Sequence, residues 1–316
     1  MQGLELSRRY YEEFGKPMLE QSFPHLLPLI AAGLCGSGSE CFGFDDELSQ
    51  DHDFEPGFCL FLPSEDLVSR RDAFLLERAY SRLPDSFAGF QRLQVSPVGG
   101  NRHGVIRISD FLTEKTGEPD GVLSVRHWVT IPSYSLAEVT NGEIYRDDSG
   151  VFTETRKRIS RFPEEIRRKR LAGNLLSAAQ SGQYAYRRCI GHGETGAAQL
   201  AVTEFVRGTM QASFLLCQIY QPYYKWGFRA MRTRLPAPFS GLADSLEYLL
   251  TTDNAEEAET KRQVMEDIAR ILSAESANQG LCRPDLPLAE SAYEVDSGIR
   301  DPEIRTLHIL SAVSSF

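Results

Sequence analysis

Residues 36–54 of this chain, GSGSECFGFDDELSQDHDF, decide how its fold is interpreted. A short apolar run at residues 26–34 ends directly before this stretch, and a second run at residues 58–62 follows it closely. Apolar runs of this length, bounded by turn residues, are typical of buried strands. The sequence therefore predicts a buried strand, a Gly/Ser turn, an acidic loop and a second buried strand.

The turn consists of Gly36, Ser37, Gly38 and Ser39. Glycines after a buried strand let the backbone turn tightly and point N–H groups at a phosphate. Ser37 or Ser39 can add a hydroxyl donor. A Gly/Ser turn by itself is more often an ordinary loop, so the turn indicates phosphate binding only in combination with its neighbours.

The acidic pair Asp51 and Asp53 is the second signal in this stretch. Residues two apart in an extended strand share a face, so both carboxylates point one way and His52 points the other. Magnesium commonly takes one or two carboxylates together with phosphate oxygens of a substrate. The alternative is a solvated acidic loop, because residues 45–47 are also acidic. Turn, acidic pair and core strand together are more specific than any one of them.

The order of a Gly-Ser turn, a spacer and an Asp-x-Asp pair resembles the signature of the polymerase-β-like nucleotidyltransferase superfamily, which includes aminoglycoside nucleotidyltransferases and small "minimal" nucleotidyltransferases. Residues 34–39, 43–53 and 220–226 also resemble an uncharacterised bacterial family of stand-alone members with a helical C-terminal region, known as a domain of unknown function. The resemblance covers most of residues 1–235. No P-loop motif and no protein-kinase motif set is present in the sequence.

The resemblance implies roles for individual residues. Gly38 and Ser39, with Ser37 beside them, match the Gly-Ser that holds a nucleoside triphosphate. Asp51 and Asp53 match the two catalytic acids that bind metal. The implied cofactor is Mg²⁺, with two ions expected, and the implied substrate is ATP or another nucleoside triphosphate.

Superfamily members usually add a third catalytic carboxylate from a neighbouring strand. Asp110 is the preferred candidate here, because alternation over residues 103–111 predicts a third strand that would carry it. The same alternation places Asp110 on the face of Ile106 and Ile108, which counts against it. The competing candidates are Glu143, Asp147 and Asp148.

The rest of the chain predicts an α+β protein. Residues 4–20 have loosely helical spacing, and from Pro163 onward helical patterns dominate, with Glu164 and Glu165 in a first turn. By resemblance, residues 1–155 form a nucleotidyltransferase-like domain with a small mixed β-sheet, flanking helices and an N-terminal helix. Residues 156–316 form a mainly α-helical domain. The basic runs 156–158 and 167–170 are expected to be solvated helix faces.

Tyr223 and Lys225 follow a Pro222 break after a predicted helix. They are candidates to line a nucleotide cleft, with Lys225 on the phosphates and an aromatic ring against the base. A packing cluster at a helix end is an equal alternative. Glu204 lies in an apolar helical pattern, and its resemblance to the general base of aminoglycoside nucleotidyltransferases competes with a surface position.

Composition limits the partners of the chain. Its 316 residues have a formal net charge of -10, which argues against non-specific binding to DNA or to an anionic membrane. The N-terminal segment lacks an apolar signal core and no apolar run could cross a bilayer, so a cytoplasmic location is predicted. Six scattered cysteines without CxxC spacing predict neither a zinc site nor a disulfide framework.

These patterns predict a magnesium-dependent nucleotidyltransferase that moves a nucleoside monophosphate, by default AMP from ATP, to a hydroxyl group. The acceptor can be a small molecule, an RNA end or a protein. The alternative is a catalytically weak nucleotide-binding protein that acts through a protein partner, as in toxin-antitoxin pairs. An acidic helical scaffold with an incidental Asp-x-Asp pair is the third hypothesis.

Overall fold

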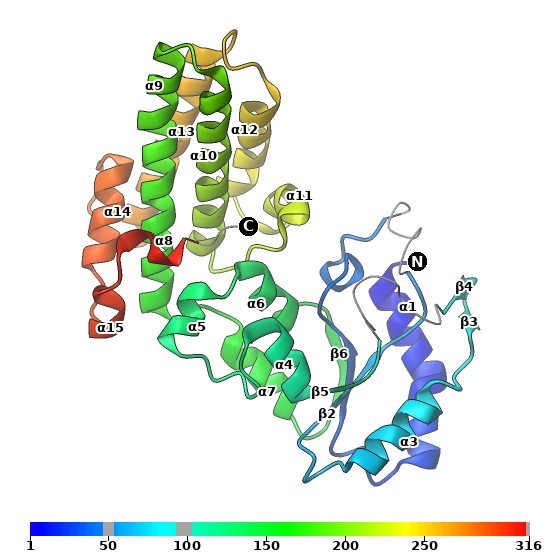
Figure 1. Cartoon of the computed structure of the whole chain (residues 1–316). Coiled ribbons are helices and arrows are strands. Elements are labelled where there is room, and N and C mark those ends of the chain that lie inside the picture. The colour runs from blue at the N-terminus through cyan, green and yellow to red at the C-terminus, as the bar shows by residue number, and fades with distance from the viewer. Residues whose placement is uncertain (47–53, 93–102, 314–316) are drawn as a thin grey trace. The chain divides into compact units, whose positions relative to one another are not determined.

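The computed structural model describes residues 1–46, 54–92 and 103–313, and Figure 1 shows their path. Asp51 and Asp53 lie outside these described residues. The chain forms two compact units. Unit 1 contains Met1–Leu123 and Ser135–Ser160, and unit 2 contains Ser124–Tyr134 and Arg161–Phe316.

Unit 1 is built on a four-stranded sheet in the order β5-β2-β1-β6. Its strands are β1 (Ala31–Leu34), β2 (Cys59–Leu62), β5 (Gly104–Arg107) and β6 (Glu143–Asp147). β1 runs antiparallel to β2 and β6, whereas β5 runs parallel to β2, so the sheet is mixed. Every residue of β1 and β2 is buried. The predicted buried strands and the small mixed sheet are confirmed.

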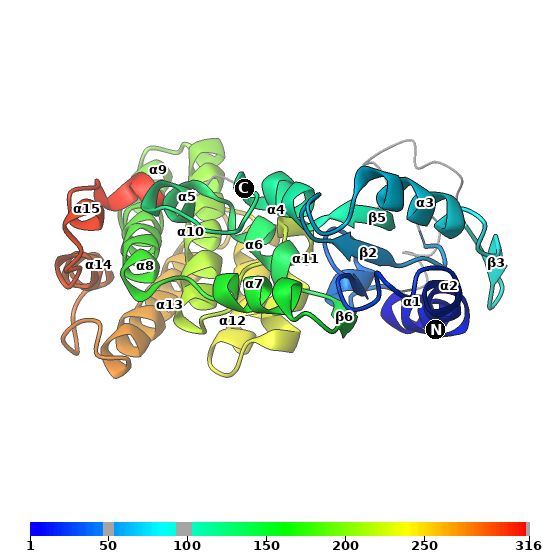
Figure 2. The same ribbon diagram turned by 90° about the horizontal axis from the view of Figure 1, so that it is seen from below.

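Helices cover both faces of this sheet, as Figure 2 shows. Leu60 and Leu62 of β2 belong to a core that also contains Tyr10, Leu19 and Leu76 from the helices on one face. Phe61, between them in sequence, faces the opposite side, where its ring lies 4.2 Å from the ring of Phe152. The helices on the first face are α1 (Gly3–Tyr10), its π-helical continuation η1 (Tyr11–Gly15), α2 (Lys16–Ser22) and α3 (Arg70–Tyr80).

The opposite face of the sheet is covered by α4 (Ile108–Thr116) and α7 (Val151–Ile159), which supply Phe111 and Phe152. Unit 1 also holds the short helix η2 (Glu40–Phe42), a two-stranded sheet of β3 (Ser86–Phe87) and β4 (Phe90–Gln91), and most of α6 (Ser133–Thr140). β1 and β2 are therefore sandwiched between apolar layers, which explains why their sequences are continuous apolar runs.

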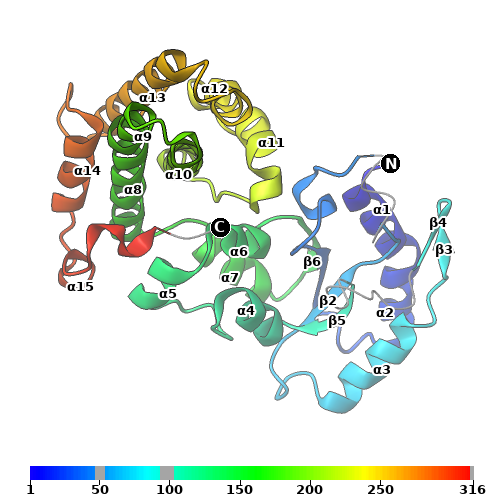
Figure 3. The ribbon, with the colours of Figure 1, turned by 45° about the horizontal axis from the view of Figure 1, so that its top comes forward.

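Unit 2 is helical throughout its regular structure, which Figure 3 shows for α8 to α15. Its α-helices are α5 (Val125–Thr130), α8 (Glu164–Ala178), α9 (Tyr186–Gly191), α10 (Thr195–Leu216), α11 (Tyr224–Arg234), α12 (Phe239–Thr251), α13 (Ala258–Asn278), α14 (Leu288–Ser297) and α15 (Pro302–Arg305). The π-helix η4 (Ala179–Ala185) joins α8 to α9, and η5 (Ile309–Ala312) is a short 3-10 helix. The predicted α+β class with a mainly helical second half is confirmed. Among the described helices, none is long and apolar enough to cross a membrane.

The basic run at residues 167–170 is not a solvated face, so that prediction is wrong. Arg170 is almost fully buried and donates to the carbonyl oxygens of Trp128, Val129 and Ile131 at 3.0, 3.1 and 2.5 Å. Burial lowers the pKa of Arg170 to about 10. Lys169 is also buried and forms an ion pair with Asp296 at 2.6 Å. Residues far away in sequence supply these acceptors, so local charge patterning could not reveal them.

Candidate functional site

The Gly36–Ser39 turn begins directly after buried β1, as the sequence predicted. Gly36 and Gly38 have φ angles of 116° and 125°, which L side chains rarely adopt. A Cβ atom on Gly38 would lie 2.2 Å from Oε1 of Glu40. Both glycines are therefore needed for the backbone path itself.

Backbone N–H groups of this turn are available as donors. The N–H groups of Ser37, Gly38 and Ser39 make no hydrogen bond within the described parts of the chain. Consecutive backbone N–H groups in a turn with alternating backbone conformations can form a concave site for an anion. Ser37 is exposed, and Gly38 and Ser39 are half-buried.

Asn141 fixes the start of the turn. Its Oδ1 accepts a hydrogen bond from the N–H of Gly36 at 2.9 Å, and its Nδ2 donates to the oxygen of Gly36 at 2.8 Å. The neighbouring Gly142 donates its N–H to the oxygen of Cys41 at 2.9 Å. The segment between α6 and β6 thus holds the start of the turn and the short helix η2 that follows it.

A lysine and a glutamate lie against the same turn. Nζ of Lys115 donates to Oγ of Ser37 at 3.0 Å, and that hydroxyl donates to Oε2 of Glu138 at 2.9 Å. Lys115 also forms ion pairs with Glu138 and Glu114, each at 2.8 Å. Burial opposes the charge of Lys115, but hydrogen bonds and charge from Glu114 and Glu138 outweigh it and raise its pKa. Lys115 is therefore a fixed cation beside the turn.

The described carboxylates near the turn have distinct environments. Asp45 accepts the N–H of Gly3 at 2.8 Å through Oδ2, and so caps the start of α1. Glu40 is buried with its carboxylate against Gly38. These carboxylates and the hydroxyls of Ser37 and Ser39 are hard oxygen donors, the type that Mg²⁺ prefers. In the described ranges, no group of three or more His, Cys, Asp or Glu is arranged to hold a metal ion.

Asp110 does not lie on a strand, so this part of the prediction is wrong. β5 ends at Arg107 and α4 begins at Ile108, which places Asp110 in the first turn of the helix. An acidic side chain there interacts favourably with the helix dipole. Asp110 is exposed and lines a cavity of about 400 Å³ together with Arg70 and Arg107.

The strand register shows which edge of the sheet each candidate occupies. Gly33 pairs with Cys59 and Cys59 pairs with Gly104, so β2 and β5 begin at the edge where β1 ends. We call this the turn edge. Leu34 pairs with Glu143, which puts the start of β6 at the turn edge as well. Asp110 follows the other end of β5, at the opposite edge.

The competing acids divide between the same two edges. Glu143, at the turn edge, forms an ion pair and a hydrogen bond with Arg8. Asp147, which pairs with Ala31 at the opposite end of β1, accepts the N–H of Thr153 at 2.8 Å. Asp148 pairs with Arg146. Of these three acids, Glu143 lies nearest the turn in the register of the sheet.

Tyr223 and Lys225 belong to unit 2, where both have aromatic neighbours. The ring of Tyr223 lies 5.4 Å from that of Tyr134 and 4.4 Å from that of Tyr224. Nζ of Lys225 lies 4.9 Å from the ring centroid of Trp226. A nucleotide-binding role for Tyr223 and Lys225 stays a prediction.

Glu204 occupies the half-exposed side of α10 and forms an ion pair with Arg207 at 2.6 Å. The pair is separated by three residues, a common spacing for exposed ion pairs on a helix. This is the environment expected for the surface alternative.

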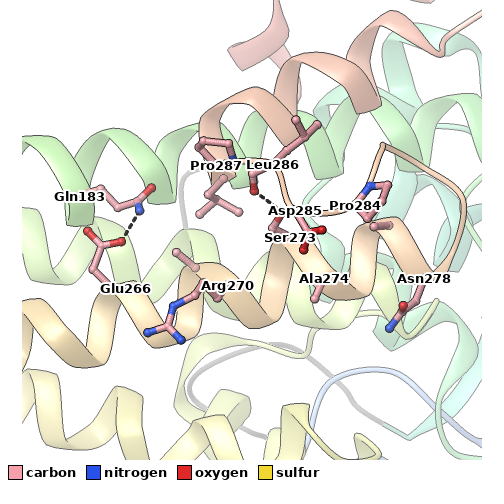
Figure 4. A pocket seen from close by; sticks show the side chains of 13 residues that line it. Gln183, Glu266, Arg270, Ser273, Ala274, Asn278, Pro284, Asp285, Leu286 and Pro287 are labelled. Atoms are coloured by element: carbon pink, nitrogen blue, oxygen red, sulfur yellow. Dashed lines mark hydrogen bonds between the residues drawn. The ribbon is translucent and has the colours of Figure 1, made fainter.

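Unit 2 also contains a cavity of about 580 Å³ between α13 and the loop before α14, shown in Figure 4. Polar side chains in its wall already have hydrogen-bond partners within the protein. Nε2 of Gln183 donates to Glu266 at 2.6 Å, and Oγ of Ser273 donates to the oxygen of Leu286 at 2.7 Å. We therefore assign no ligand to this cavity.

Sequence reasoning missed Lys115, Glu138 and Asn141, which the fold brings to the turn. Ser37 and Lys115 are 78 residues apart, and Ser37 and Glu138 are 101 residues apart. Asn141 directly precedes Gly142, which has a φ of 64°, and this pair was the available local signal for a structured connection. It did not identify the partner segment.

Residues 128–227 match the model of a family described as a domain of unknown function, DUF4037. The solved structure of a nucleotidyltransferase-like protein from Exiguobacterium sibiricum is similar at 12% sequence identity and a TM-score of 0.39, covering 86% of this chain and 81% of that chain. No curated protein matches. Residues 128–227, which include Glu138 and Asn141, are thus similar to a DUF4037 domain, and the expected resemblance to a domain of unknown function is confirmed.

Proposed function

We propose that this chain is a magnesium-dependent nucleotidyltransferase whose triphosphate site is the Gly36–Ser39 turn. The observation that supports the proposal most strongly is the set of three consecutive N–H groups, those of Ser37, Gly38 and Ser39, without a partner in the described chain. They follow a buried strand, and Asn141 fixes the turn that presents them. Such groups bind anions without a charged side chain of their own.

Asp51 and Asp53 are proposed to hold two Mg²⁺ ions next to this turn. Only four residues separate Asp46, the last described residue before the gap, from Asp51. The oxygen donors around the turn are of the type that suits Mg²⁺. When bound, Mg²⁺ would neutralise phosphate charge and align the reacting groups.

The reaction needs positioning more than covalent participation by the protein. A hydroxyl oxygen of the acceptor forms a bond to the α-phosphorus of the nucleotide, ATP by default. The bond from that phosphorus to the bridging oxygen breaks, and pyrophosphate leaves with the bonding electrons. A carboxylate takes the hydroxyl proton, and among the described alternatives we place Glu143 before Asp110 because Glu143 lies at the turn edge.

Tyr223 and Lys225 remain proposed nucleotide-binding residues of unit 2. Tyr223 is partly exposed, and its ring could stack on a base. Lys225 could bind phosphate as a point charge. Substituting each with alanine should weaken ATP binding and leave the fold of unit 2 unchanged.

Radiolabel transfer tests the proposed reaction directly. The protein is incubated with Mg²⁺ and α-labelled nucleotides in the presence of small molecules, RNA and protein acceptors. We expect label on one acceptor class, and its loss in Asp51→Asn combined with Asp53→Asn. Exposed Asp66 provides the matched control Asp66→Asn, which should transfer label as the wild type does.

Three other outcomes have defined meanings. Nucleotide binding without transfer to any acceptor would favour a binding protein that acts through a partner. The absence of Mg²⁺-dependent nucleotide binding would exclude both activities. Equal loss in Asp66→Asn would show that the effect is not specific to the acidic pair.

A further inference from the structure

Lys115 lies on α4, a helix that begins at the edge of the sheet opposite the Gly36–Ser39 turn. It lies in the last turn of α4, whose first residue follows the end of β5 at the far edge of the sheet. Because α4 rises about 1.5 Å per residue, it carries the chain back about 12 Å toward the turn edge. Its last turn thereby places the ammonium group of Lys115 within hydrogen-bond distance of the Ser37 hydroxyl in the turn.

The lysine side chain is fixed by its surroundings. Only 11% of its side-chain surface is exposed, and the side chain of Glu138, which pairs with it, is 14% exposed. The Ser37 hydroxyl bridges the two, accepting from Lys115 and donating to Glu138. A lysine with no partner on the surface of a helix would keep its ammonium group in water. The ammonium group is instead held at the Ser37 side chain of the turn.

We infer that Lys115 is the phosphate-binding cation of the turn, and that Glu138 holds it in position until a polyphosphate binds. This inference rests on the proposed function and adds to it a residue outside the Gly-Ser and Asp-x-Asp motifs. Phosphate oxygens replace the Glu138 carboxylate as the acceptor for the Lys115 ammonium group. No covalent bond changes, and Lys115 remains protonated throughout.

In this arrangement Glu138 opposes polyphosphate binding, whereas Lys115 favours it. Its carboxylate lies beside the turn and repels a polyphosphate, while it also neutralises the lysine. Removing its charge should therefore strengthen anion binding. If Glu138 were instead a ligand of the catalytic metal, removing its charge would weaken Mg²⁺-dependent binding.

Calorimetric titration of the full chain with inorganic tripolyphosphate and with ATP, each in Mg²⁺, tests the inference. We expect Lys115→Met to weaken binding of both ligands by about tenfold to a hundredfold, because one charge-assisted contact is lost. Lys115→Arg should retain most of the wild-type affinity for tripolyphosphate and ATP. Glu138→Gln should tighten binding by about threefold, a smaller effect because it removes repulsion rather than a contact.

The controls separate this inference from the proposed function. Lys16→Met, at an exposed position in unit 1, should bind as the wild type does. Thermal unfolding of each variant confirms that the fold is kept. Wild-type affinity in Lys115→Met would overturn the inference while nucleotidyl transfer stands. If tripolyphosphate binding depends on Lys115 but no label is transferred, the inference about Lys115 stands and the proposed nucleotidyltransferase activity is rejected. No binding of either ligand to the wild type would overturn both.

Discussion

The two ends of α4 carry different chemistry, and only Asp110, in its first turn, was singled out from the sequence, as part of a strand. Asp110 at the first turn is exposed, and Lys115 in the last turn is bonded to Ser37 of the Gly36–Ser39 turn. These two residues are five positions apart, about 7.5 Å along the axis and roughly 140° around it. The charge of a residue such as Asp110 therefore does not show which end of its helix contacts the turn.

The comparison gives each end of α4 a distinct expected role. The last turn should influence anion binding through Ser37, whereas the first turn should influence only local helix stability. Variants at Asn141 and Gly142, which lie between α6 and β6, and at Asp110 test whether the two ends of α4 differ in this way.

The largest expected effect is at Gly142, which donates its N–H to the oxygen of Cys41 in η2, just after the Gly36–Ser39 turn. Its φ is 64°, and a Cβ atom would lie 2.0 Å from the oxygen of Leu34. Gly142→Ala should lower the free energy of unfolding by about 4 kcal/mol, through backbone strain and collision with β1. Gly150→Ala is the matched control, because Gly150 has a φ of 71° but nothing within 4 Å.

Denaturant unfolding of both variants provides the measurement. Gly150→Ala should lose about 1 to 2 kcal/mol, from conformational strain alone. Equal losses in the two variants would mean that close contact between residues 142 and 34 does not hold the turn.

The next largest effect is expected at Asn141. Asn141→Ala removes both hydrogen bonds to Gly36 and leaves a buried N–H group and a carbonyl oxygen with no partner from that side chain. We expect a loss of about 2 to 3 kcal/mol in the free energy of unfolding. ATP affinity should fall as well, measured by calorimetry, because the N–H groups of Ser37 to Ser39 lose their fixed geometry. Lost stability with unchanged affinity would show that the turn does not bind phosphate.

Asp110 should give a small effect. Asp110→Asn removes a favourable charge from the first turn of α4, worth about 0.3 to 1 kcal/mol. Label transfer should stay at the wild-type level, because Asp110 lies beyond the end of β5 that is away from the turn. If Asp110→Asn folds normally but abolishes transfer, the first turn of α4 is catalytic and the distinction between its ends fails.

The smallest expected effect is that of pH between 6 and 9. The pKa of Lys115 is raised above its ordinary value of 10.5, because Glu114 and Glu138 outweigh the effect of burial. A cation with a raised pKa keeps its charge below that value and loses it only as the pH rises through it. The ratio of ATP affinities between wild type and Lys115→Met should therefore stay constant over this range. A ratio that falls toward one by pH 9 would contradict the assignment of Lys115.

Much of the fold could be predicted from the sequence because its signals are local. The apolar runs around the Gly36–Ser39 turn predicted two buried strands, and the glycines predicted the turn. Asp110 was misplaced because its alternating pattern spans a strand and the first turn of a helix, and Ile108 continues both periodicities. Local patterns do not show where a strand of four residues ends.

The candidate site was only partly predictable for a different reason. Its backbone donors come from one continuous segment, whereas Lys115, Glu138 and Asn141 arrive through pairings of the sheet and packing of helices. Arg170 shows the same limit, since its three carbonyl acceptors lie about 40 residues earlier in the chain. Tertiary contacts of this kind have no local sequence signal.

We propose that the backbone N–H groups of Ser37, Gly38 and Ser39 bind the triphosphate of a nucleotide. The most direct measurement is a titration of the isotope-labelled chain with ATP and Mg²⁺, following the amide resonances of these residues by NMR. We expect saturable shifts at all three amides; tripolyphosphate should reproduce these shifts, and Lys115→Met should weaken them. Saturable ATP binding that shifts other amides and leaves these three unchanged would contradict it.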